Sequence, residues 1–197
     1  MFQYLSTIIQ NTQISSGTGS FKTIAGNNRS VTREILSDGG NNKYAEKITF
    51  DGVNNQKFAI ALGYNPSMCN SSCMDNTNKL ICAHLYSKGY SGYYLINLYS
   101  NVSSNKKFNN KTIFWRYLND ILSRFVNNLF IFWGTTVYVN KNIIDAINNC
   151  SNSIYTIGRN KKGINIMHKH PGRGVTVATI ASFARQKPIK LYLGKLK

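Results

Sequence analysis

Acidic residues are scarce in this chain of 197 residues. The chain has only 7 Asp and Glu but 24 Lys and Arg, so its formal net charge at neutral pH is +17. No acid follows Asp145, whereas ten Lys and Arg do. AT-rich coding enriches both Asn, of which there are 26, and Lys, but it does not explain the missing acids. We therefore expect the partner to be a polyanion, most simply DNA.

Signals for membranes, secretion and metals are also missing. No window of 18 apolar residues exists, and the N-terminus has neither a basic start nor a cleavage site. The chain is therefore expected to be cytoplasmic, without a membrane partner, and it is expected to act as a monomer. The cysteines contain no CxxC pair, so we expect reduced thiols, no metal and no cofactor. They are Cys69, Cys73, Cys82 and Cys150.

Hydrophobic patterns predict one α/β domain. A polar arm and edge elements are expected over 1–43, and a single domain with a basic tail over 44–197. Strands are predicted at 44–50, 57–63, 92–98, 129–133 and 154–158. Helices are predicted at 75–88, 112–126, 135–149 and 175–184, with a short helix or extended piece at 2–10 and a loop around 15–20. Strands that are apolar on both faces and alternate with helices predict a three-layer α/β/α domain with a central, mostly parallel, four-stranded sheet.

Polar motifs follow the predicted strands, where ligands of parallel sheets usually bind. They read ALGYNPS (61–67), YYLINLYSNVS (93–103), LFIFWG (129–134) and HKHPGRG (168–174). In this order they resemble the uracil-DNA glycosylase superfamily. A closer match is an uncharacterised family of bacterial and phage proteins with an Asn-Pro-Ser segment, an Asp-x-Thr segment and a terminal His-Pro. The resemblance covers roughly residues 56–175.

The superfamily resemblance implies catalytic roles for Asn65 and His170. Asn65 would orient the attacking water, although an amide cannot take its proton, and His170 would hydrogen-bond the base carbonyl as charge develops. Asn97 would read the edge of a flipped pyrimidine with its donor and its acceptor, and His168 is a weaker candidate for the same pocket. The residues alone leave plainer interpretations open. These are a turn at Asn65-Pro66, a structural Asn97 and solvated histidines.

Specificity is expected to depend on the residue after Pro66. In the uracil-specific branch an aromatic residue there blocks the C5 position, whereas Ser67 leaves that space open for larger pyrimidines. Tyr64 and Met68 would line the same pocket. Asp75, through Thr77, would support the loop, and an N-cap role for Asp75 is an equal alternative.

Basic residues around the His-Pro loop are expected to contact DNA phosphates. They are Arg159, Lys161, Lys162, Lys169 and Arg173. Arg173 is also a candidate wedge that fills the gap left by the flipped base.

The sequence therefore predicts a monofunctional DNA glycosylase that removes a modified or mismatched pyrimidine, in base excision repair or in defence against phages. Two alternatives stay open. One is a DNA-binding protein of the same fold without catalysis, and the other is a glycosidase acting on free nucleosides or nucleotides.

Overall fold

The computed structural model describes residues 1–63, 66–67, 69–100, 102, 113–125, 128–131, 145–147, 149–150, 154–156 and 184–185. Its helices are α1 (Phe2–Ile8), α2 (Asn76–Ser87) and α3 (Ile113–Arg124). Its strands are β1 (Gln13–Lys22), β2 (Asn28–Ser37), β3 (Lys43–Phe50), β4 (Phe58–Gly63), β5 (Gly92–Asn97), β6 (Leu129–Ile131), β7 (Ile154–Thr156) and β8 (Ala184–Arg185). Among these helices, none is long and apolar enough to cross a membrane.

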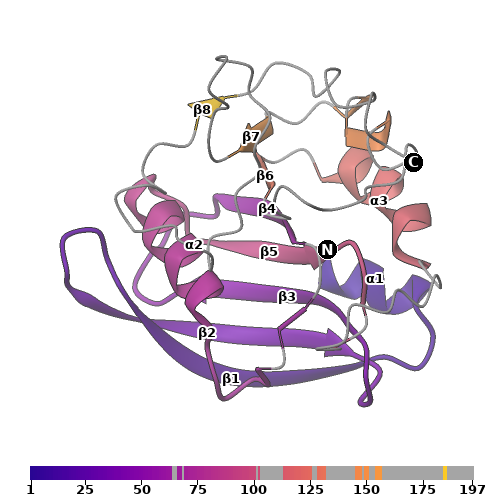
Figure 1. Ribbon diagram of the computed structural model, residues 1–197, viewed down its shortest axis with the longest axis horizontal. Helices are drawn as coiled ribbons and strands as arrows, with labels where there is room; N and C mark the ends of the chain where they lie inside the picture. Colours follow the sequence, from indigo (N-terminus) through magenta and orange to yellow (C-terminus); the bar gives the residue numbers. More distant parts are fainter. Residues whose placement is uncertain are drawn as a thin grey trace.

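All described strands belong to one mixed sheet (Figure 1). The strand order is β1-β2-β3-β5-β4-β6-β7-β8. Strands β5, β4, β6 and β7 run parallel to one another. The pairs β1–β2, β2–β3, β3–β5 and β7–β8 are antiparallel. A four-stranded parallel sheet would end at β5. Here the sheet continues beyond β5 with the antiparallel strands β3, β2 and β1.

The prediction of a central, mostly parallel, four-stranded sheet is wrong. The strands predicted at 57–63, 92–98, 129–133 and 154–158 do form, as β4 to β7, but the sheet continues beyond them and antiparallel pairing prevails. The predicted loop around 15–20 is part of β1. Its side chains are mostly exposed, because β1 lies at the sheet edge, so the apolar alternation that marks a strand is weak there.

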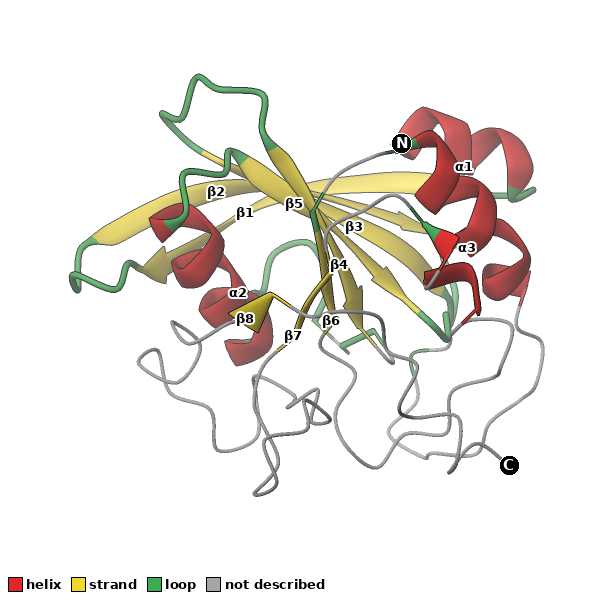
Figure 2. Ribbon diagram, turned by 90° about the horizontal axis from the view of Figure 1, so that it is seen from above, coloured by secondary structure: helices red, strands yellow, loops and turns green. Residues whose placement is uncertain are grey.

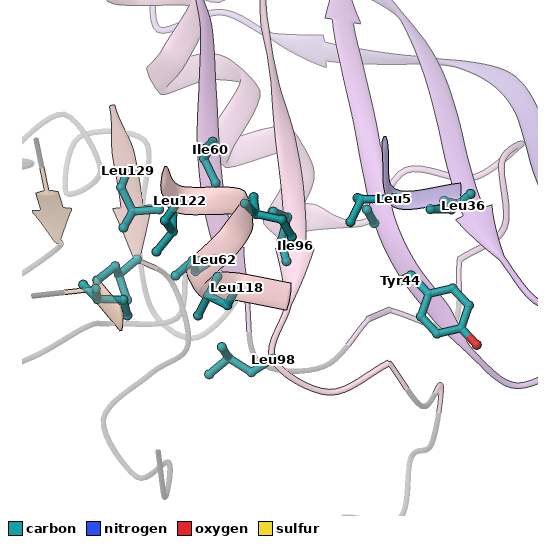
Figure 3. Close-up of a cluster of buried hydrophobic side chains, with 14 of the residues drawn as sticks. Leu5, Leu36, Tyr44, Ile60, Leu62, Ile96, Leu98, Leu118, Leu122 and Leu129 are labelled. Atoms are coloured by element: carbon teal, nitrogen blue, oxygen red, sulfur yellow. The ribbon is translucent and has the colours of Figure 1, made fainter. Parts of the chain in front are cut away.

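Helices pack on both faces of the sheet, and two buried clusters result (Figure 2). Strand β4 shows why, since its alternate side chains point to opposite faces. Ile60 and Leu62 join α1 and α3 in one cluster, which Figure 3 shows. Ala59 and Ala61 belong to the other cluster, where the small alanines leave room for α2. Both faces of the central strands are therefore buried, as their continuous apolar runs predict.

Candidate functional site

A pocket of about 250 Å³ lies on the α2 face of the sheet, where β4 and β5 end. Its polar walls come from β3, from the segment between β4 and α2, and from the first turn of α2. The lining residues are Ile35, Lys43, Ala45, Glu46, Gly63, Pro66, Ser67, Asp75, Thr77, Asn78, Ile81, Leu95 and Asn97. Charged and amide side chains thus line the pocket together with the apolar Ile35, Ile81 and Leu95.

Parallel pairing brings Gly63 and Asn97 side by side at the pocket. The two residues are register partners at the carboxyl ends of β4 and β5. A Cβ atom on Gly63 would lie 2.5 Å from Asn97 Oδ1, so only glycine leaves room for the amide in this position. Strand β4 ends in glycine because its neighbour's side chain needs that space.

The Asn97 side chain is buried in the pocket wall without a protein partner. The residue is 4% exposed. Among the described residues, its amide makes no hydrogen bond to protein. Among the described residues, the Asn97 amide atoms are not among the fully buried polar atoms that lack a partner, so they are accessible from the pocket that Asn97 lines. Asn97 is therefore a candidate binding position for a ligand with complementary donors and acceptors.

A buried ion pair on β2 and β3 lies next to the pocket, because Glu46, which lines the pocket, pairs with Arg33. Arg33 Nε donates to Glu46 Oε1 at 2.6 Å, and Asn78 Nδ2 donates to Glu46 Oε2 at 3.2 Å. Tyr93 Oη in turn donates to Asn78 Oδ1 at 2.8 Å. Burial raises the pKa of Glu46, and the guanidinium of Arg33 opposes that shift. This network fixes Asn78, and with it the first turn of α2, against the sheet.

Lys43 connects the pocket to the segment that follows β4. Its Nζ donates to the carbonyl oxygen of Ser67 at 2.9 Å and also to that of Cys69. Burial lowers the pKa of Lys43, while the carboxylate of Glu46 works in the opposite direction. The ammonium group thereby holds Ser67 at the pocket wall through its backbone.

Asp75 caps α2 beside the pocket. Its Oδ1 accepts a hydrogen bond of 2.7 Å from the backbone N–H of Asn78, which satisfies one free donor of the first helical turn. Its other carboxylate oxygen has no hydrogen-bond partner among the described residues. Asp75 therefore has an N-cap role and also leaves an acceptor at a pocket that Thr77 lines beside it.

A disulfide joins Cys69 to Cys73 in the segment over the pocket. The expectation of reduced thiols is therefore wrong for these two cysteines, whereas Cys82 and Cys150 are in no disulfide. Ser67 Oγ accepts a hydrogen bond of 3.2 Å from the backbone N–H of Cys69, just before the ring. Within the described residues, no group of three or more His, Cys, Asp or Glu side chains could hold a metal ion.

Four of the residues predicted from sequence come together at this pocket: Ser67, Asp75, Thr77 and Asn97. The others lie outside the described residues and stay predictions. They are Tyr64, Asn65, Met68, Arg159, Lys161, Lys162, His168, Lys169, His170 and Arg173.

Sequence reasoning missed Lys43, Glu46 and Asn78. A signal for Glu46 was available, because Glu46 shares its alternation phase in β3 with the buried Ile48 and Phe50. An acid on the apolar side of a strand indicates a buried partner.

Comparison with known proteins gives one family. The model of a family described as a protein of unknown function, DUF1643, matches residues 48–171. No curated protein and no solved structure matches. The matching family is not a uracil-DNA glycosylase family, so the superfamily assignment made from the four strand-end motifs is wrong. Short Asn-Pro, Trp-Gly and His-Pro motifs are turn and strand-end signals that unrelated sheets share.

Proposed function

The chain belongs to the DUF1643 family, whose function is unknown, and we propose that it is a DNA N-glycosylase that takes one pyrimidine into the pocket beside Asn97. The proposal rests on the pocket and on the charge of the chain, and not on the superfamily resemblance. The observation that carries it is the Asn97 amide, which has a donor and an acceptor without protein partners among the described residues, at a pocket that also holds the Asp75 carboxylate.

The size and chemistry of the pocket suit a single base. Its volume of about 250 Å³ is below the range of about 300–1,000 Å³ typical for drug-sized ligands. The Watson–Crick edge of a pyrimidine carries a hydrogen-bond donor next to an acceptor. The Asn97 amide, with its own acceptor and donor, can bond to both. Ile81 and Leu95 supply apolar surface for the ring. Ser67 adds little bulk to the wall, so we expect C5-substituted pyrimidines to enter.

Asp75 is the residue proposed to activate water. In the step, the oxygen of water bonds to C1′ of the sugar, and the water proton passes to the free carboxylate oxygen of Asp75. The C1′–N bond breaks, and its electron pair leaves with the base. The departing base then takes up a proton to become neutral. The ammonium group of Lys43, at the same pocket, favours the negative charge that develops on the base.

The net charge of +17 supports DNA as the partner. A chain with so few acids attracts polyanions over long distances, and lysines and arginines neutralise phosphates on contact. A free nucleoside would not require such charge, so we place the substrate base within DNA. A cytoplasmic location is part of the same proposal.

Alkaline cleavage of duplex oligonucleotides tests this function. The substrates carry one uracil, one mismatched thymine or one 5-hydroxymethylcytosine, and hot alkali breaks the strand wherever a base has been lost. We expect cleavage with the wild type, and roughly 10²–10⁴-fold slower cleavage with Asp75→Asn, which keeps the helix cap but cannot accept the proton. Asn97→Ala should also be slow, whereas Asn54→Ala, an exposed asparagine outside the pocket lining, should match the wild type.

A gel shift on the same oligonucleotides separates the proposal from its non-catalytic alternative. Asp75→Asn should retard the DNA as strongly as the wild type, because removing a proton acceptor changes the rate and not the ground-state affinity. A wild type that retards every oligonucleotide but cleaves none would make the chain a DNA-binding protein. Cleavage at equal rates by the wild type and Asp75→Asn would remove Asp75 from the reaction.

A further inference from the structure

We infer that the Cys69–Cys73 disulfide is a reversible modification site that controls the order of the pocket wall. Pro66, Ser67 and Asp75, which flank the disulfide in the sequence, line the pocket, so the described residues of the segment 66–75 contribute to that wall. The disulfide closes a small ring in its middle, with a sequence separation of 4. The inference concerns the pocket whatever ligand it takes, so it goes beyond the proposed glycosylase activity.

Two cations, the buried Arg33 and the half-buried Lys43, bind the ring through its carbonyl oxygens. Arg33 Nη1 donates to the carbonyl of Asn70 at 3.1 Å, to that of Ser71 at 3.3 Å, and to that of Cys73. Lys43 Nζ donates to the carbonyl of Cys69. Four carbonyl oxygens of one short ring thus converge on Arg33 and Lys43.

That convergence depends on the ring being closed. The three carbonyl dipoles that point toward Arg33 Nη1 repel each other, and an open chain gains conformational entropy by turning them apart. The disulfide removes this freedom, so the carbonyls stay available to the two cations. Opening the ring should therefore loosen both its contacts with the sheet and the adjoining pocket wall.

The disulfide ring packs against strand β1. A Cβ atom on Gly17 would lie 2.2 Å from the carbonyl oxygen of Ser71. The ring thus packs directly on the β1 backbone, at a position where any larger residue would displace it. Glycine in the middle of an edge strand is unfavourable for the strand itself, which the close approach of the ring explains.

The disulfide is accessible to a dithiol reductant. Cys73 is exposed, whereas Cys69 is half-buried. One thiolate of the dithiol attacks Cys73 Sγ, the S–S bond breaks, and its electron pair goes to Cys69 Sγ, which takes a proton. The second thiol of the reductant then displaces Cys73 as a thiol. The protein gains two electrons and two protons, and the dithiol becomes a cyclic disulfide.

Hydrogen exchange measured by mass spectrometry on the full chain tests the inference. The wild type is compared after oxidation with glutathione disulfide and after reduction with dithiothreitol, beside Cys69→Ser/Cys73→Ser and the control Cys150→Ser. Alkylation after unfolding should count two free thiols in the oxidised wild type and four in the reduced one.

We expect the backbone amides of residues 67–75 to exchange at least about tenfold faster in the reduced wild type and in the double variant. Cys150→Ser should behave like the oxidised wild type, and slow exchange in β4 and β5 should show that every form stays folded. No DNA is involved, so the result is independent of the proposed activity. Equal exchange of 67–75 in the oxidised and reduced wild type, or four free thiols after oxidation, would overturn the inference.

Discussion

The position of the Asn97 amide depends on a single missing methyl group. Because a Cβ atom on Gly63 would lie 2.5 Å from Asn97 Oδ1, Gly63→Ala must turn the amide away from its place in the pocket. We predict that Gly63→Ala lowers kcat/KM for base release by about tenfold or more, since a misplaced hydrogen-bonding group loses much of its effect.

The matched control is Gly40→Ala. Gly40 has φ outside the left-handed region, and a Cβ atom there would meet its nearest neighbour at an ordinary 3.5 Å. Gly40→Ala should therefore leave kcat/KM unchanged. Wild-type kcat/KM in Gly63→Ala would show that the orientation of Asn97 does not matter.

His84 makes the stability of the fold dependent on pH. Burial against the sheet, with a smaller effect of Lys88, lowers the pKa of His84 from 6.5 to about 4. Between these two values the unfolded chain binds a proton that the folded chain does not, so the free energy of unfolding falls as the pH drops through this window. The loss approaches about 3 kcal/mol at pH 4.

His84→Leu isolates this effect, because it removes the titrating group and keeps the site apolar. Denaturant unfolding at pH 7.5, 6 and 5 should show a free energy of unfolding that declines more steeply for the wild type than for His84→Leu. Burial raises the pKa of Glu46, which changes stability in the opposite direction, but this contribution is common to both proteins and cancels in the comparison. If the free energies of unfolding of the wild type and His84→Leu change in parallel with pH, His84 is not buried in its neutral form.

At the scale of elements, Asp75 combines an N-cap with the proposed proton acceptor, and two substitutions separate these roles. Asp75→Ala should lower the free energy of unfolding by about 1 kcal/mol, because the 2.7 Å hydrogen bond to Asn78 N is lost. Asp75→Asn should unfold nearly like the wild type, since asparagine is an equally good cap. Both variants should lose base release.

Denaturant unfolding and alkaline cleavage on the same preparations supply the two readouts. Activity that survives in Asp75→Asn and falls only in Asp75→Ala would make Asp75 a structural cap without a chemical role.

The sequence predicts the central elements well and the edge of the sheet poorly. The apolar runs of β4 and β5, and the spacing of α2 after Asp75, identify these elements because burial on two faces leaves a continuous apolar pattern. Strand β1 is exposed along most of its length, so its polar residues read as a loop. Strand direction is not encoded in such patterns either, and the parallel fold class was inferred from the central strands alone.

The site was predictable where it follows strand ends and unpredictable where it depends on pairing across the sheet. Asn97 is identified because it ends an apolar strand. The contact between Arg33 and Glu46 requires the register of β2 on β3, which the sequence does not specify without the structure. The phase of alternation would still have placed both charges on the buried face, since Arg33 shares its phase with Val31 and Ile35.

At the scale of the whole molecule, the charge of +17 predicts how binding depends on salt. Each phosphate that a lysine or arginine neutralises releases counterions, so affinity for duplex DNA should fall by about tenfold or more between 50 and 200 mM salt. Fluorescence anisotropy of a labelled duplex across this range measures the slope. An affinity that does not change with salt would exclude a nucleic acid as the partner.

The identity of the released base tests the proposed function most directly. Mass spectrometry of free bases is applied to DNAs that contain uracil, thymine mismatches, 5-hydroxymethylcytosine or larger C5 groups, after incubation with the wild type or with Asp75→Asn. We predict that the wild type releases a free pyrimidine in equal amount to the abasic sites formed, accepts C5-substituted bases at least as well as uracil, and exceeds Asp75→Asn by roughly 10²-fold or more. No free base above the level of Asp75→Asn from any of these DNAs would contradict the proposal.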